Sequence, residues 1–160
     1  MAITWSGMRK KLEEGYLAPS LRGRIQYFAT SYRESHDGDK GRASIWLDGE
    51  EVLKSNYFDK ERQIYNEWKY TGFRAWRERI SYVQDQGGFD QNNFYRAFAE
   101  FDNQGIEASL ESDNSLVRLW AVLDRRLGKR RLLALADRME QEIDYIRFFI
   151  GYGSRPRGCR

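Results

Sequence analysis

The sequence predicts an α+β fold: an N-terminal helix, a three-stranded antiparallel meander, then four or five helices packed on the sheet. Three observations predict it. Apolar residues have helical spacing before residue 15, alternate with a period of two over residues 24–55, and return to helical spacing from residue 59. Strands precede helices instead of alternating with them, which is typical of α+β rather than α/β proteins.

The chain is long enough for one core. It has 160 residues, of which 41% are hydrophobic, and its five Trp, ten Tyr and nine Phe supply large rings for packing. No linker divides it. We therefore expect a single domain over residues 1–153 and a basic flexible tail over residues 154–160.

The first helix is expected over residues 5–14. Its apolar face consists of Trp5, Met8 and Leu12. Thr4 or Ser6 can cap its N-terminus, because a side-chain oxygen there accepts a hydrogen bond from a free backbone N–H group. Gly15 is expected to end the helix.

Three strands are expected next. Residues 24–33 and 42–48 each alternate between two faces, and residues 35–41 between them are rich in turn formers. Asp48–Gly49 predicts a tight turn into a short third strand over residues 51–55.

The region after the sheet is expected to be helical. Residues 59–85 form either one kinked helix or two helices, and Gly87–Gly88 ends them. Asp90 opens the next helix, whose aromatic face consists of Phe94, Phe98 and Phe101.

Two further helices complete the prediction. Asp113 or Asn114 caps one that ends at Gly128. The last is predicted as one continuous helix over residues 132–150, with apolar residues alternately four and three apart. These residues are Leu132, Ala136, Met139, Ile143, Ile146 and Ile150. Their regular seam also predicts a homodimer through residues 132–150, as an alternative to packing within the monomer.

The residue types exclude most catalytic and metal chemistry. Cys159 is the single cysteine and His36 the single histidine, too few for a disulfide or a zinc site. No nucleophile elbow and no glycine-rich phosphate loop occurs. We therefore predict no catalytic residue, no metal and no cofactor, and favour a protein that is not an enzyme.

Charge points to one cluster. The net charge is +3, and 20 of the 27 basic residues are Arg. Five cations lie within residues 125–131, namely Arg125, Arg126, Lys129, Arg130 and Arg131. They could bind an anion or nucleic acid. Alternatively, the first two complement the negative end of a helix, but the last three open the next helix, where positive charge is unfavourable.

A second set of candidates surrounds the first predicted turn. Arg33 and Arg42 flank His36 in the sequence and could clamp an anion. With His36 as general base, the set would make a small enzyme that acts on a phosphate-containing substrate. The alternative is a turn histidine with no chemical role.

Several segments spread along the chain carry a family resemblance. They are Trp5–Ser6, Lys11–Glu13, Pro19–Ile25, Tyr32–Arg33, His36–Asp37, Gly41–Arg42, Asp48–Gly49 and Leu123–Arg130. Together they resemble a family of small uncharacterised bacterial proteins, from which the middle of the chain, about Tyr57 to Phe101, departs. The resemblance implies no activity. It implies that Arg33, His36, Arg42 and residues 123–129 form one structural or binding unit, and the small size also resembles orphan proteins of mobile gene cassettes.

These observations favour a cytoplasmic, non-catalytic binding or adaptor module whose partner is a protein or an anionic ligand. No apolar stretch approaches the roughly 18 residues of a membrane helix, so no membrane partner is expected. Abundant Trp, Tyr and Arg are typical of interface hot spots. The alternatives are the small enzyme around His36 and a nucleic-acid-binding protein that uses residues 125–131.

Overall fold

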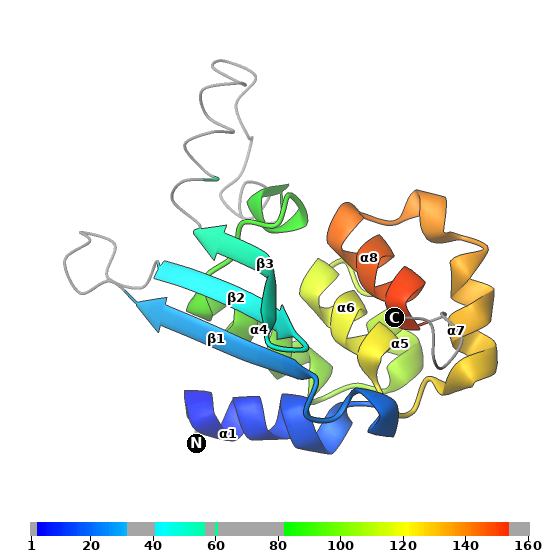
Figure 1. Ribbon diagram of the computed structural model, residues 1–160, viewed down its shortest axis with the longest axis horizontal. Coiled ribbons are helices and arrows are strands. Elements are labelled where there is room, and N and C mark those ends of the chain that lie inside the picture. Colours follow the sequence, from blue (N-terminus) through cyan, green and yellow to red (C-terminus); the bar gives the residue numbers. More distant parts are fainter. Residues whose placement is uncertain (1–2, 32–40, 57–59, 61–81, 154–160) are drawn as a thin grey trace, which may run out of the picture. The chain divides into compact units, whose positions relative to one another are not determined.

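The computed structural model describes residues 3–31, 41–56, 60 and 82–153 (Figure 1). Its elements are α1 (Trp5–Lys10), η1 (Lys11–Tyr16), η2 (Pro19–Leu21), β1 (Ile25–Ser31), β2 (Gly41–Leu47), β3 (Glu50–Asn56), α4 (Gln91–Phe101), α5 (Ile106–Leu110), α6 (Ser115–Leu123), α7 (Gly128–Ala136), η3 (Met139–Gln141) and α8 (Asp144–Gly153). The order confirms the α+β class. No helix in the described ranges is both long and apolar enough to cross a membrane.

The chain forms two compact units. One comprises Met1–Gly23 with Phe98–Arg160, and the other comprises Arg24–Ala97. The expected single domain over residues 1–153, and the packing of the helices on the sheet, stay predictions. The expected tail, residues 154–160, lies outside the described residues.

The sheet is the predicted antiparallel meander, with strand order β1-β2-β3. Ile25 lies opposite Leu47 and Tyr27 opposite Ile45, and these four side chains are buried. On the other face Phe28 packs edge-on against Trp46, with ring centroids 5.6 Å apart. The alternation of buried and exposed residues confirms the period of two.

The Asp48–Gly49 turn between β2 and β3 is also confirmed. Both residues have positive φ, 54° and 80°, as a two-residue hairpin turn requires. Arg24 fixes the turn, because its Nε and Nη2 each donate to the Asp48 carboxylate at 2.8 Å. The Asp48 N–H group donates to the Arg24 carbonyl at 2.8 Å.

The N-terminal helix begins where predicted and ends differently. Thr4 caps it, since its hydroxyl accepts a hydrogen bond from Gly7 N at 3.1 Å. The prediction that Gly15 ends the helix is wrong. The chain widens into the π-helical turn η1 and continues to Tyr16, after which Leu17 is extended and pairs with Asp124.

A reciprocal cap between Asp90 and Asn93 starts α4, which confirms the prediction that Asp90 opens this helix. The Asn93 N–H group donates to the Asp90 carboxylate at 3.0 Å, and the Asp90 N–H group donates to the Asn93 side chain at 2.8 Å. Gly87, with φ of 86°, ends the preceding helical residues 82–85. Apart from Lys60 and this last turn, the predicted helix or helices over residues 59–85 lie outside the described part of the chain.

Asn114 caps α6, whose side chains are almost all buried. The prediction that this helix reaches Gly128 is wrong. It ends at Leu123, because Asp124 adopts extended backbone angles, φ −76° and ψ 139°. Gly128, with φ of 66°, instead begins α7.

The predicted continuous helix over residues 132–150 is wrong as well. The segment divides into α7, η3 and α8, and α8 buries Tyr145, Ile146, Phe149 and Ile150. Because α8 packs on both α6 and α7, the chain has to turn between α7 and α8, which a straight helix cannot do.

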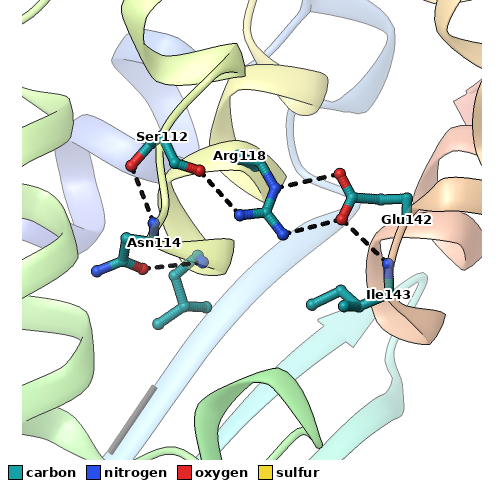
Figure 2. A network of polar contacts seen from close by, with 6 residues as sticks. Ser112, Asn114, Arg118, Glu142 and Ile143 are labelled. Atoms are coloured by element: carbon teal, nitrogen blue, oxygen red, sulfur yellow. Dashed lines mark hydrogen bonds and ion pairs between the residues drawn. The ribbon is translucent and has the colours of Figure 1, made fainter. Parts of the chain in front are cut away.

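An ion pair holds this turn (Figure 2). Arg118 of α6 donates from Nε and Nη2 to the Glu142 carboxylate at 3.1 and 2.9 Å, and from Nη1 to the Ser112 carbonyl at 2.8 Å. The same carboxylate accepts a hydrogen bond from Ile143 N at 3.0 Å. Arg118 therefore fixes where α8 begins.

The cap of α4 gives a first test. We expect Asp90→Ala to lower the free energy of unfolding by about 1–2 kcal/mol, because the N–H group of Asn93 loses its acceptor in a buried position. Urea denaturation measures the change. Asp113→Ala is the matched control, since Asp113 is exposed and is expected to change stability by less than about 0.5 kcal/mol. Equal effects of the two substitutions would contradict the assigned role of Asp90.

Candidate functional site

The turn between α6 and α7 is held by the segment that follows η1. Ala18 N donates to the Leu123 carbonyl at 3.0 Å, and Arg125 N donates to the Tyr16 carbonyl at 2.8 Å. These bonds flank the bridge between Leu17 and Asp124. The backbone that carries the predicted basic cluster is therefore anchored on both sides of Asp124.

Asp124 is buried at the centre of this turn, with 2% of its surface exposed. Its carboxylate accepts three hydrogen bonds from Arg126: from the backbone N at 2.7 Å, from Nε at 2.9 Å and from Nη2 at 2.9 Å. Hydrogen bonding to Asp124 raises the pKa of the Arg126 guanidinium above its usual value. Arg126 is thus bound internally, although the sequence made it a ligand candidate.

Aromatic rings complete the surroundings of Arg126. Its guanidinium lies 5.3 Å from the Tyr16 ring centroid and 5.7 Å from that of Phe101. The two rings meet edge-on, 4.8 Å apart. Arg126 therefore joins the turn to η1 and to α4.

Tyr16 and Asp102 form a second polar contact beside Arg126. The Tyr16 hydroxyl donates to the Asp102 carboxylate, whose other oxygen accepts a hydrogen bond from Lys11 Nζ at 3.3 Å. Burial and the hydrogen bond to Asp102 raise the pKa of Tyr16 to about 12. Tyr16 is protonated at neutral pH and cannot act as a general base there.

The other four cations of the cluster divide into two groups. Arg131 pairs with the exposed Glu107. Arg125, Lys129 and Arg130 are exposed and have no ion-pair partner among the residues that the structure describes. We call these three residues the cationic junction.

The backbone adds positive charge to the cationic junction. The nine-residue helix α7 begins at Gly128, its N-cap residue Leu127 makes no side-chain cap, and no acidic residue lies in its first turn. The free N–H groups and the positive end of the helix dipole therefore lie beside Lys129 and Arg130. The arrangement can bind an anion.

The second predicted set is only partly described. Arg33 and His36 lie outside the described residues. Arg42 is exposed on β2 and pairs with Glu51. The alternative that the sequence allowed, a small enzyme with His36 as base, therefore stays a prediction. In the described ranges no group of three or more His, Cys, Asp and Glu side chains is arranged to hold a metal ion.

Sequence reasoning missed the polar residues that support the junction. Tyr16 and Asp102 are 86 residues apart, and no periodic pattern connects them. Asp124 had one local signal, an acid two residues before an arginine at the end of an apolar helix. Its burial could not be read from that spacing.

The Asp124–Arg126 pair gives a second test. We expect Arg126→Ala to lower the free energy of unfolding by about 2–3 kcal/mol, because a buried carboxylate loses its charged partner. This loss of unfolding free energy is smaller than the loss expected for a fully buried ion pair, since 35% of the Arg126 side chain is exposed. Arg125→Ala is the matched control, expected to change stability by less than about 0.5 kcal/mol in the same urea titration. A control that destabilises the protein as much would contradict this role of Arg126.

The titration of Tyr16 gives a third test. Its pKa is raised from 10.0 to about 12, so the folded protein holds this proton more tightly than the unfolded chain. The resulting stability is complete below pH 10 and is lost as the pH rises through about 12. NMR of 13C-labelled tyrosine, assigned with Tyr16→Phe, measures the pKa. Asp102→Asn should lower it without restoring the usual value, because burial remains. A Tyr16 pKa near 10 in the unaltered protein would contradict the prediction.

Comparison with known proteins bears on the resemblance seen in the sequence. No curated protein and no solved structure matches the chain. A family model, described as the SF0329 protein family, matches residues 4–152 and so covers both compact units. The predicted resemblance to an uncharacterised family is thereby confirmed, and the chain belongs to the SF0329 protein family.

Proposed function

We propose that the protein is a non-catalytic binding module that takes an anionic ligand, or an anionic segment of a partner, at the cationic junction. One observation carries the proposal: Arg125, Lys129 and Arg130 lie within six residues of sequence, are exposed and have no ion-pair partner in the described ranges. Their neighbours Arg126 and Arg131 both have one.

The helix dipole makes this arrangement unfavourable without a ligand. A cation in the first turn of a helix opposes the dipole by about 0.3–1 kcal/mol, and α7 has no acid there to offset it. A bound anion would instead interact favourably both with the positive end of the helix dipole and with the cations. It would also accept hydrogen bonds from the free N–H groups.

The junction is built on a constrained backbone. The Arg126 hydrogen bonds to Asp124 and the pairing of Leu17 with Asp124 hold the turn that contains Arg125 and leads into α7, which carries Lys129 and Arg130. A site held in place before binding loses less conformational entropy when the ligand arrives. The constrained backbone of this turn and the exposed cations next to it together favour anion binding at the junction.

Removing the three cations tests the proposal. We expect replacement of Arg125, Lys129 and Arg130 by Ala to weaken binding of inorganic polyphosphate by about tenfold or more. With an oligonucleotide, the slope of log K against log salt should fall by up to about 3, since each phosphate contact contributes almost one. Fluorescence anisotropy in a salt series measures both.

The matched control removes equal charge elsewhere. Replacement of the exposed Lys10, Arg22 and Arg138 by Ala also lowers the net charge from +3 to zero. If both triple variants lose binding equally, overall charge and not the junction is responsible, and the proposal is wrong. It is also wrong if the unaltered protein binds neither polyphosphate, oligonucleotide nor polyglutamate at low salt.

The preferred probe identifies the ligand class. Tighter binding of the oligonucleotide than of polyphosphate would support the nucleic-acid alternative at the same residues. Preference for polyglutamate would support an acidic protein segment. Both outcomes support an anion site at the junction.

A further inference from the structure

The exposed face of α7 has a charge pattern that is complementary to itself. Apart from Gly128 at its first position, the exposed residues of this helix and its C-cap lie in one stripe: Lys129, Arg130, Leu133, Ala134 and Asp137. At about 100° per residue they span roughly 140° of the helix. Residues 131, 132, 135 and 136 occupy the opposite side and are partly buried.

Along the helix, the stripe runs from positive through apolar to negative. Lys129 and Asp137 lie at its two ends, and Leu133 lies midway between them with 47% of its surface exposed. Neither Lys129 nor Asp137 has an ion-pair partner in the described part of the chain. A second α7 laid antiparallel would therefore place Lys129 against the partner's Asp137, Asp137 against the partner's Lys129, and Leu133 against the partner's Leu133.

We propose that α7 pairs with α7 of a second copy of this chain in this antiparallel register. The contact is isologous, so a single two-fold axis through Leu133 satisfies both copies. Two salt bridges flank one apolar contact, and the dipoles of antiparallel helices attract each other. Charge complementarity identifies the occupant of this face.

Other occupants fit the stripe less well. A nucleic acid or an anionic membrane lying along α7 would meet the exposed Asp137 and Glu140, with one exposed cation, Arg138, between them, after passing Lys129 and Arg130. Uniform negative charge is repelled at that end. A second copy presents opposite charge at each end.

The dimer is expected to be weak. One stripe of a nine-residue helix buries less than the roughly 1,200–2,000 Å² of a stable interface. Association should therefore depend on concentration and be weakened by salt. The contact also differs from the dimer that the sequence predicted, because residues 132–150 are not one helix and Ile143 lies outside α7.

Charge reversal tests the register. Sedimentation at increasing concentration should show association of the unaltered chain, and Lys129→Glu or Asp137→Lys should each weaken it by about tenfold or more, because each substitution acts twice in a symmetric dimer. An equimolar mixture of the two variants should associate again, since every pair then has opposite charges. The double variant should also associate.

Matched controls carry the same charge changes elsewhere. Arg22→Glu and Glu111→Lys alter exposed residues outside α7 and should leave association unchanged. A protein that stays a monomer at the highest concentration overturns the proposal. So does failure of the mixed variants to associate, or an equal loss in the controls.

A cysteine at the two-fold axis tests the orientation. In a Cys159→Ser background, Leu133→Cys should form a disulfide-linked dimer under mild oxidation, because residue 133 lies against itself. Ser20→Cys, at an exposed position outside α7, is the control and should form much less. Equal cross-linking of both variants overturns the assigned axis.

The dimer shares Lys129 with the proposed anion site, and one variant separates the two proposals. Asp137→Lys weakens the dimer and leaves all three cations of the junction in place, so it should still bind polyphosphate. Loss of polyphosphate binding by this variant would overturn the separation of the two sites. Failure of the unaltered chain to bind any anion would overturn the proposed function alone.

Discussion

The buried carboxylate of Asp124 is the constraint on which the helical unit depends. A buried charge is strongly unfavourable unless it is paired and hydrogen-bonded, and Arg126 provides both a guanidinium and a backbone N–H group within two residues. To make these contacts the chain must leave the helical conformation at Asp124. The end of α6, the turn after it and the start of α7 all follow from that requirement.

Aromatic rings make the same pair part of a larger core. Arg126 lies over Tyr16 and Phe101, and Phe101 packs edge-on against Trp120 of α6 with centroids 5.8 Å apart. Trp120 in turn meets Phe98 at 6.5 Å. One arginine therefore connects an internal ion pair with an aromatic cluster that joins η1, α4 and α6. This combination suits Arg, whose planar guanidinium can bind a carboxylate at its edge while its face meets a ring.

Three cations of the basic cluster take no part in this core. Of five clustered cations, two have an acidic partner; the other three are exposed, Arg125 in the turn before α7 and Lys129 and Arg130 in its first turn. The two proposals meet at Lys129, which belongs both to the cationic junction and to the self-complementary stripe. If both are correct, an anion at Lys129 and a second copy exclude each other, and by linkage each weakens the other by the same factor.

The sequence by itself predicted several features that depend on neighbours along the chain. Asp90 caps the helix it precedes, Asp48–Gly49 makes the hairpin turn, and alternation places Ile25 and Tyr27 on one face of the sheet. For two other helices the sequence offered two caps each, and the structure shows that Thr4 and Asn114 are the ones used. Each of these signals acts over two to four residues, so it is readable without the fold.

Only the tertiary structure decided where the later helices end and which cations remain exposed. Apolar spacings of four and three over residues 132–150 fit one long helix as well as two short helices, because the spacing does not say which surface the apolar side chains meet. The burial of Asp124 and the pairing of Tyr16 with Asp102 depend on segments far apart in the sequence, in the second case by 86 residues. Such contacts form because folding buries apolar surface contributed by segments far apart in the sequence. The spacing of residues within one segment therefore does not predict them.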